Sequence, residues 1–286
     1  MSKVAFIGVG YMGYGMAKNL LKKHQLFVFA HKNRKPITRL LKAGAKELKI
    51  YKELKENNID CLMICVTDTP IAIKIAKKIT NFLSKKTLVI DLTTHNKYGA
   101  LQMQKIFKSK KIDYTFCGVM GGPVQSEQGV LGGIFGGTKN NFYKSKKYLN
   151  CFCKSVFNFG NVTKASSAKL LSNFLSLITT TTVIEFFKSA NKLNIDINLL
   201  YEVAKLGSGN SGALDRIASK AIKRNYKGYV FSVDNTFKDL SYINDLVLDL
   251  PNANKLTKTA KMFYKNASKK GLGKLLISEL ILKDKY

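Results

Sequence analysis

The chain has 286 residues and is 45% hydrophobic, which is enough to bury one large core or two modest ones. Its formal net charge is +30, yet only four of its 48 basic residues are arginines, and the lysines are spread over the whole chain. Nucleic-acid readers concentrate arginines in a stripe or patch. This composition therefore favours a lysine-rich, solvated surface over a specific nucleic-acid partner.

Three further features of the sequence argue against a secreted protein, a membrane protein and a metal-binding protein. The first ten residues resemble a strand and a glycine turn rather than a cleavable leader, so we expect a cytoplasmic protein. The longest apolar helical stretch, residues 170–184, is shorter than the roughly 20 residues that cross a bilayer, so we expect a buried helix and no membrane partner. Five cysteines without a CxxC pair or a Cys/His cluster predict reduced thiols and no metal site.

Strand and helix patterns alternate through the first half of the chain. Short apolar and β-branched runs predict strands at residues 4–7, 26–30, 61–66, 87–90 and 114–117. Two further runs, 134–136 and 156–159, are compatible with edge strands. Helical stretches between the strands imply right-handed crossovers and a mostly parallel sheet with both faces covered. The predicted fold class is α/β, with a doubly wound parallel sheet.

The character of the sequence changes after Gly160. Helical periodicity then dominates to the end of the chain, and Pro251 marks one break between helices. We therefore predict two domains, an α/β domain at residues 1–162 and an all-α domain at residues 163–286.

A glycine motif follows the first predicted strand and opens the first predicted helix. It consists of Gly8, Val9, Gly10, Tyr11, Met12 and Gly13. In the GxGxxG pattern the first glycine permits a tight turn, the second lets the backbone approach a pyrophosphate, and the third allows helix and strand to pack closely. The helix N-terminus then faces the phosphates. This context predicts a Rossmann-type domain that binds a nicotinamide dinucleotide.

The choice of nicotinamide cofactor should depend on the end of the second strand, where an acidic residue would bind the ribose 2′-hydroxyl. The residues found there are His31, Lys32, Asn33 and Arg34. No carboxylate is among them, and their cations suit a 2′-phosphate. The sequence thus predicts a preference for NADP(H), with NAD(H) as a possible alternative.

The opening segment from Gly8 to Leu20, GVGYMGYGMAKNL, resembles that of the β-hydroxyacid dehydrogenase family, which includes 3-hydroxyisobutyrate dehydrogenases and glyoxylate or succinic semialdehyde reductases. Two further segments are similar to family motifs. The run DLTT at residues 91–94 implies that Thr94 lies near the nicotinamide, and FSVDNTFKDL at residues 231–240 implies that Lys238 lies near the cofactor.

The segment VMGGP, residues 119–123, is similar to the motif with which the family holds the carboxylate of its substrate. The resemblance assigns Met120, Gly121 and Gly122 to substrate binding. Met120 stands where the family has a serine, and Gly118 stands where it has a proline. The backbone amides of the two glycines remain able to bind an anion, but one hydroxyl donor is lost.

The segment KLLSN, residues 169–173, is similar to the family's Lys-x-x-Asn-Asn motif. The resemblance makes Lys169 the proton donor and acceptor and Asn173 a substrate contact, and their spacing of four places both on one helix face. Lys164, after Asn161, looks similar by eye, but it precedes the predicted amphipathic helix and has no asparagine four residues later. The predicted function is an oxidoreductase that interconverts a small 3-hydroxy acid and its semialdehyde or keto acid.

Three other functions fit parts of the sequence, but each fits it less well than this one. Leu276 stands where the family commonly has an aspartate. An imine reductase would suit the more apolar pocket that Met120 and Leu276 imply, but those relatives commonly replace the lysine. A phosphogluconate-type enzyme has a larger helical domain and a histidine where Ser172 stands. A cofactor-binding module without catalysis is disfavoured because Lys169, Asn173 and Lys238 are all present. The resemblance also implies a homodimer or a tetramer.

Overall fold

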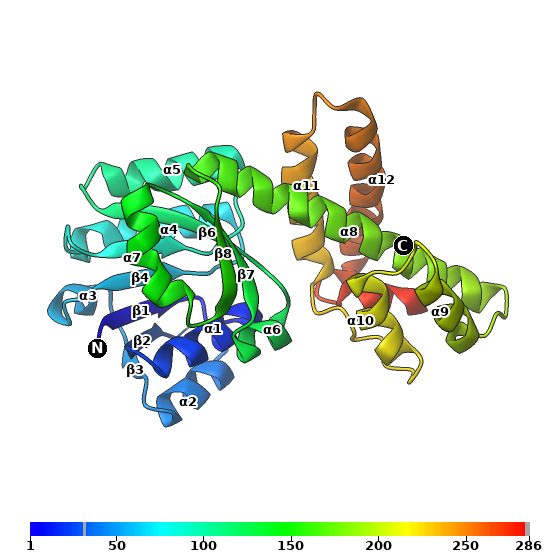
Figure 1. Cartoon of the computed structure of the whole chain (residues 1–286), viewed down its shortest axis with the longest axis horizontal. Coiled ribbons are helices and arrows are strands. Elements are labelled where there is room, and N and C mark those ends of the chain that lie inside the picture. The colour runs from blue at the N-terminus through cyan, green and yellow to red at the C-terminus, as the bar shows by residue number, and fades with distance from the viewer. Residues whose placement is uncertain (31–32, 284–286) are drawn as a thin grey trace. The chain divides into compact units, whose positions relative to one another are not determined.

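The computed structural model describes residues 1–30 and 33–283 (Figure 1). It divides into two compact units, Met1–Lys169 and Leu170–Tyr286. The boundary that we predict between residues 162 and 163 falls at the start of the long helix α8, Val162–Lys192. The division between the two compact units falls later in the same helix, after Lys169.

The first unit is built on one sheet, in which the described residues form eight strands ordered β3-β2-β1-β4-β5-β6-β7-β8. The strands are β1 Lys3–Ile7, β2 Gln25–Phe29, β3 Lys46–Leu48, β4 Cys61–Ile64, β5 Leu88–Asp91, β6 Asp113–Met120, β7 Leu131–Gly136 and β8 Cys153–Asn158. All pairs from β3 to β6 are parallel, β7 is antiparallel to β6, and β8 is parallel to β7. The predicted doubly wound α/β fold is confirmed.

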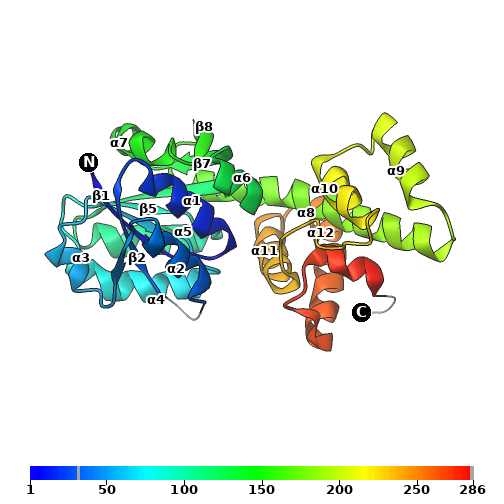
Figure 2. The same cartoon turned by 90° about the horizontal axis from the view of Figure 1, so that it is seen from below.

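Helices cover both faces of this sheet (Figures 1 and 2). They are α1 Tyr11–Leu21, α2 Lys35–Lys42, α3 Glu53–Glu56, α4 Thr69–Ile79, α5 Lys97–Lys108, α6 Pro123–Gln128 and α7 Lys139–Leu149, with the short turn η1 Thr80–Phe82. Successive side chains of a strand point to opposite faces. In β1, Val4 and Phe6 therefore pack with α1, α2 and α7, while Ala5 and Ile7 pack with α3, α4 and α5.

Several elements of the first unit were not predicted or were predicted only in part. Strand β3 has only three residues and carries Lys46 and Glu47, so it has no apolar run to detect. Strand β7 was predicted only over residues 134–136 and as an edge strand, whereas it spans Leu131–Gly136 and lies between β6 and β8. Its three glycines have a low strand propensity, which pairing on both sides offsets. Helices α3, α6 and α7 were also missed, since their apolar positions are few.

Helix α8 is 31 residues long, about twice the apolar stretch at residues 170–184 that we expected to form a buried helix. Lys164 therefore lies inside the helix, and the expectation that it precedes the helix is wrong. Among the described residues, α8 alone is long and apolar enough to cross a membrane, and 39% of its most apolar window is buried inside the protein. Buried core helices pass the same test of length and composition.

The second unit is helical, as predicted. It contains most of α8 and the elements α9 Ile197–Leu206, α10 Gly212–Ala221, α11 Val233–Leu246, α12 Pro251–Ala267, η2 Ser268–Leu272 and η3 Ile277–Leu282. Its core includes Leu177, Phe187, Ile217, Leu240 and Tyr264. Pro251 occupies the first turn of α12, where its missing N–H costs no hydrogen bond.

Candidate active site

The candidate site of the first unit lies at the carboxyl edge of the parallel strands. Strands β1, β4, β5 and β6 run in the same direction, so the loops that follow them meet at one edge of the sheet. Strand β1 has β2 on one side and β4 on the other, so the order of the strands reverses between β1 and β4, and this is the switch point of the sheet. Ligands of open α/β sheets bind in the crevice at such a point.

The glycine turn follows β1 at this switch point. Gly8 has a φ of +101°, and a Cβ atom there would overlap the carbonyl oxygen of Cys65. A Cβ atom on Gly13 would overlap the carbonyl oxygen of Gly8, whereas one on Gly10 would meet no atom within 4 Å. The glycines at positions 8 and 13 thus serve close packing, and Gly10 leaves its backbone open to a ligand.

The residues around this turn fit a pyrophosphate. Gly10 caps α1 without a side-chain hydrogen bond, and the first turn of α1 carries no acidic residue. The first N–H groups of a helix have no partner within it, and together with the helix dipole they attract anions. Val9 and Met12 pack against the core, while the side chain of Tyr11 is 77% exposed.

The predicted 2′-phosphate region differs from expectation in one respect. The Arg34 guanidinium binds the Glu47 carboxylate through two hydrogen bonds of 2.6 and 3.1 Å. This pairing raises the pKa of Arg34 and lowers the pKa of Glu47. We expected no carboxylate here, and Glu47 was missed because it arrives from β3. Asn33 accepts a hydrogen bond from the Lys35 amide, while His31 and Lys32 lie outside the described residues.

Thr94 follows β5 and is half-buried, next to a buried polar network. The Asp91 carboxylate accepts hydrogen bonds from the Tyr114 hydroxyl at 3.0 Å and from His95 Nε2 at 2.9 Å. Burial, with the nearby Asp91 charge, raises the pKa of Tyr114. Sequence reasoning missed His95, although its spacing of four from Asp91 at the end of a strand was visible.

The Lys169 side chain is buried, with an exposure of 8%. Its amine donates a hydrogen bond to the Val119 carbonyl oxygen at 2.9 Å and lies 3.2 Å from the Met120 sulfur. A Cβ atom on Gly118 would come within 2.8 to 3.1 Å of the Lys169 stem. Gly118 therefore leaves room for the lysine to lie along β6. Lys164, the similar lysine, is exposed.

The predicted substrate glycines begin where β6 ends at Met120. Gly121 adopts a φ of +123°, and Gly122 precedes α6. The Gly122 amide donates a hydrogen bond of 3.0 Å to the Gln125 side chain, so it already has a partner in this structure. Sequence reasoning missed Gln125.

Helix α6, which follows these glycines, is fastened to α1. The Asn19 side-chain amide lies within hydrogen-bonding distance of the Gly15, Ser126 and Glu127 carbonyl oxygens, at 3.0, 2.9 and 3.1 Å. The Ser126 hydroxyl donates a hydrogen bond of 2.7 Å to the Met12 carbonyl oxygen. Helices α1 and α6 are thus joined by direct hydrogen bonds.

A second polar cluster lies in the helical unit. Asn173 Nδ2 donates to Asp239 Oδ2 at 2.7 Å, and Lys238 Nζ lies 2.9 Å from Asp239 Oδ1. Asp239 is only 2% exposed, so its charge is buried and paired. Asn173 and Lys238 were predicted site residues, whereas Asp239, which joins them, was not. Leu276 forms a backbone bridge with Ser232.

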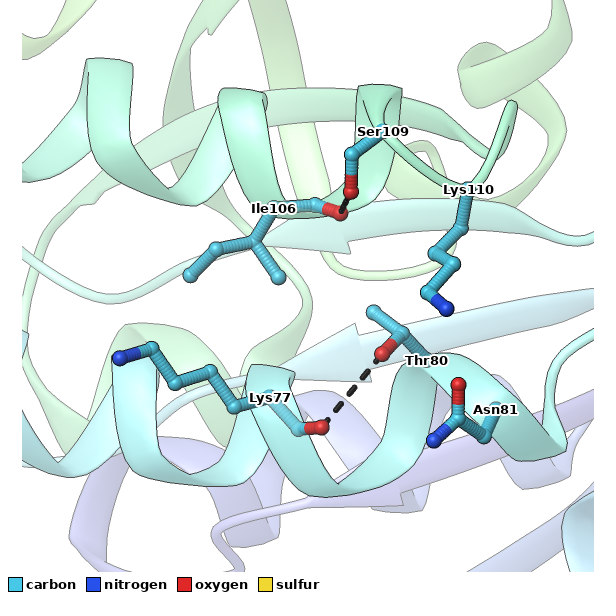
Figure 3. Close-up of a pocket in the computed structure, with 6 residues that line it drawn as sticks. All are labelled: Lys77, Thr80, Asn81, Ile106, Ser109 and Lys110. Carbon is cyan, nitrogen blue, oxygen red and sulfur yellow. Dashed lines mark hydrogen bonds between the residues drawn. The ribbon is translucent and has the colours of Figure 1, made fainter.

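A cavity of about 330 Å³ lies elsewhere on the first unit (Figure 3). Its lining residues are Lys77, Thr80, Asn81, Ile106, Ser109 and Lys110. These residues come from the last turns of α4 and α5, from η1 and from the turn after α5, whereas the start of α4 faces His95 at the carboxyl edge of the sheet. The cavity is therefore separate from the glycine turn and is not part of the candidate site.

The fold and the glycine turn define a dinucleotide-binding α/β oxidoreductase. Residues 3–160 match the family described as the NAD binding domain of 6-phosphogluconate dehydrogenase, and residues 163–282 match the family described as NAD-binding of NADP-dependent 3-hydroxyisobutyrate dehydrogenase. The chain belongs to the β-hydroxyacid dehydrogenase family of NAD(P)-dependent enzymes.

Full-length relatives agree with this assignment. The chain is 26% identical to mitochondrial 3-hydroxyisobutyrate dehydrogenase of Drosophila melanogaster, over 99% of this chain and 90% of that protein. It is 25% identical to the chloroplastic glyoxylate/succinic semialdehyde reductase 2 of Arabidopsis thaliana, over 94% of this chain and 75% of that protein.

Solved structures share the fold at lower sequence identity. A 3-hydroxyisobutyrate dehydrogenase from Salmonella typhimurium superposes with a TM-score of 0.90 at 22% identity, covering 99% of each chain. The protein Psf3, in complex with NADP+ and 2-OPP, has a TM-score of 0.87 at 20% identity, covering 97% of this chain and 98% of the other. An imine reductase from Pseudomonas sp. has a TM-score of 0.54 at 17% identity, covering 99% and 98%.

Proposed function

We propose that the protein is an NADP(H)-preferring dehydrogenase that interconverts a small 3-hydroxy acid and its semialdehyde or keto acid. The observation that carries this proposal is the buried Lys169 amine beside the end of β6. It lies at the same edge of the sheet as the glycine turn, where a cofactor and a substrate would meet.

The glycine turn would hold the pyrophosphate of the cofactor through the open backbone around Gly10 and the N-terminus of α1. When bound, the nicotinamide supplies or accepts the hydride of the reaction. We assign the 2′-phosphate to the segment His31, Lys32, Asn33 and Arg34. The NADP+ complex of Psf3 supports this preference by analogy, while Glu47 opposes it by sharing the Arg34 charge.

Lys169 would act as the general acid and base. In the reductive direction its ammonium gives a proton to the substrate oxygen, and in the oxidative direction its amine accepts the hydroxyl proton. The Val119 carbonyl oxygen orients one N–H of the amine, and the packing of its stem on Gly118 limits where the amine can reach. Both contacts keep the proton donor at a defined place.

The substrate carboxylate would bind near Met120, Gly121 and Gly122. Met120 supplies no hydroxyl donor, and the Gly122 amide is bonded to Gln125, so the Gly121 amide is the remaining backbone donor of the pair. We further propose, from the family resemblance, that Asn173 contacts the substrate, that Thr94 and Lys238 contact the cofactor, and that the protein is a cytoplasmic dimer or tetramer.

The first experiment is a substrate panel of glyoxylate, succinic semialdehyde and tartronic semialdehyde, followed by the absorbance of NADPH and of NADH. We expect turnover of at least one carbonyl acid, faster with NADPH than with NADH. Absence of turnover with every acid and both cofactors would overturn the proposed function.

Lys169→Ala tests the role of the lysine. We expect kcat to fall by about 10³-fold because proton transfer to the substrate oxygen is lost, while the Kd of NADPH stays within about threefold. Lys164→Ala, which removes an exposed lysine from the same helix, is the matched control and should leave kcat unchanged. Full activity in Lys169→Ala would rule out this assignment.

An imine reductase is the second candidate. The Met120 sulfur beside the Lys169 amine gives this part of the site a thioether in place of a hydroxyl, which suits a less polar substrate. A cyclic imine added to the panel separates the two candidates. Faster NADPH oxidation with the imine than with any carbonyl acid would favour the reductase.

A further inference from the structure

A continuous hydrogen-bonded network runs beneath the carboxyl edge of the first unit. The Val66 amide, in the loop after β4, donates to the Thr93 hydroxyl at 3.2 Å, and the Thr93 amide donates to Asp91 Oδ1 at 2.9 Å. The other carboxylate oxygen of Asp91 accepts from His95 Nε2 at 2.9 Å. The loops that follow β4 and β5 are therefore joined through the Thr93 hydroxyl, and the Asp91 carboxylate links the Thr93 amide to His95.

His95 extends this network to two helices. Its Nδ1 lies 2.8 Å from the Thr69 hydroxyl in the first turn of α4, and its carbonyl oxygen accepts a hydrogen bond of 2.7 Å from the Ser166 hydroxyl of α8. Ser166 precedes Lys169 by three residues, which is about one helical turn. His95 thus connects the end of β5, the start of α4 and the helix that carries Lys169.

The burial of the Asp91, His95 and Ser166 side chains excludes direct contact with a ligand. Asp91, His95 and Ser166 have an exposure of 0%, so none of them can touch a substrate or a cofactor. The two ring nitrogens of His95 lie 2.9 Å from Asp91 and 2.8 Å from the Thr69 hydroxyl, and a donor at Nε2 with an acceptor at Nδ1 satisfies both contacts. With every side-chain nitrogen and oxygen of the pair bonded, the cost of burying the two polar groups is offset.

We propose that His95, held by Asp91, is a positioning residue that keeps the Thr94 loop and the Lys169 helix in a fixed mutual arrangement. This proposal rests on the proposed function, since it concerns where the Lys169 amine lies relative to the cofactor loop. A displacement of about 1 Å in a catalytic group lowers turnover by about 10²-fold, so a hydrogen bond one turn away is well placed to matter.

Three variants of the full-length protein test this role through kinetics. His95→Leu removes both side-chain hydrogen bonds, and we expect kcat to fall by about 30-fold with the Kd of NADPH within about threefold. His95→Gln keeps a donor toward Asp91 and an acceptor toward Thr69, and we expect it to recover kcat to within about fivefold of the wild type. Ser166→Ala, which removes only the bond to the His95 carbonyl, should lower kcat by about fivefold.

Ser145→Ala is the matched control for Ser166→Ala. Ser145 is equally buried on a helix of the same unit, and its hydroxyl has no hydrogen-bond partner among the described residues. Its removal should leave kcat within twofold of the wild type, since no hydrogen bond is lost. Thermal unfolding of all four variants accompanies the kinetics, so that a loss of folded protein is recognised.

Hydrogen–deuterium exchange of the protein without cofactor gives a readout that does not depend on activity. In Ser166→Ala and His95→Leu, we expect amides of residues 162–169 to exchange about tenfold faster, while β1 and β4 keep their protection. If the wild type turns over no carbonyl acid, the proposed function fails, and this exchange measurement still decides whether His95 holds α8. Unchanged exchange in these variants, or His95→Leu with wild-type kcat, would overturn the positioning role.

Discussion

The glycine turn and the lysine site lie at the same edge of the sheet but are built in opposite ways. The turn around Gly8 and Gly10 offers backbone and no side chain, whereas the lysine site offers one buried amine on a long stem. Both depend on a missing Cβ atom. At Gly8 its absence lets two backbone segments meet, and at Gly118 it lets a side chain lie along the strand. A glycine can therefore serve folding in one place and the position of a reactive group in another.

The largest expected effect on stability comes from a substitution at Gly8. Gly8→Ala combines a strained φ of +101° with overlap of the Cys65 carbonyl oxygen, so unfolding should become easier by about 3 kcal/mol or more. Thermal or urea unfolding measures this loss. Gly10→Ala is the control, because its Cβ meets no atom within 4 Å. It should unfold like the wild type and bind NADPH about tenfold more weakly, since the added methyl group obstructs the phosphates.

Gly118→Ala should act on turnover rather than on folding. The new Cβ would stand 2.8 to 3.1 Å from the Lys169 stem, and a flexible side chain can shift to relieve that contact. We expect kcat to fall by about 30-fold because the amine moves, with a stability loss of about 1 kcal/mol and unchanged NADPH binding. Steady-state kinetics and NADPH fluorescence measure the two quantities. Equal losses in kcat and in NADPH affinity would show that Gly118 does not act only through the position of the Lys169 amine.

The smallest expected effect is on cofactor affinity and concerns the ion pair between Arg34, which precedes α2, and Glu47 of β3. Glu47→Gln removes the carboxylate that competes with a 2′-phosphate for Arg34, so the Kd of NADPH should fall by about threefold. The Kd of NADH, which has no 2′-phosphate, should not change and serves as the control. Titrations of both cofactors by fluorescence test this, and equal changes in the two values would argue against the proposed binding site for the phosphate.

Much of the fold was predictable because its signals are local. The strand before Gly8, the helix after Gly13 and the alternation of apolar runs up to residue 117 depend on neighbours in the chain. Strand β3 was not predictable, since Lys46 and Glu47 become strand residues only through pairing with β2. The length of α8 was underestimated because its ends are polar and its helical state does not require an apolar run.

In the candidate site, too, the sequence revealed the residues of local motifs but not their distant partners. The motifs singled out Lys169, Asn173 and Lys238, and their roles remain predictions. The contacts that hold them were missed, namely the packing of the Lys169 stem on Gly118, which was noted only for its missing proline, and Asp239 between Asn173 and Lys238. Asn173 and Asp239 are 66 residues apart in the chain. Pairs with such separations leave no periodic pattern in a single sequence.

By itself, the sequence determined the α/β and helical halves, the glycine turn and the family, because each depends on short motifs and on the spacing of apolar residues. Only the tertiary structure decided which lysine is buried, which carboxylate meets Arg34 and which residues bond to His95. The physical reason is that burial and hydrogen bonding depend on atoms brought together by the sheet and its crossovers. These neighbours lie far apart along the chain and become neighbours only when it folds.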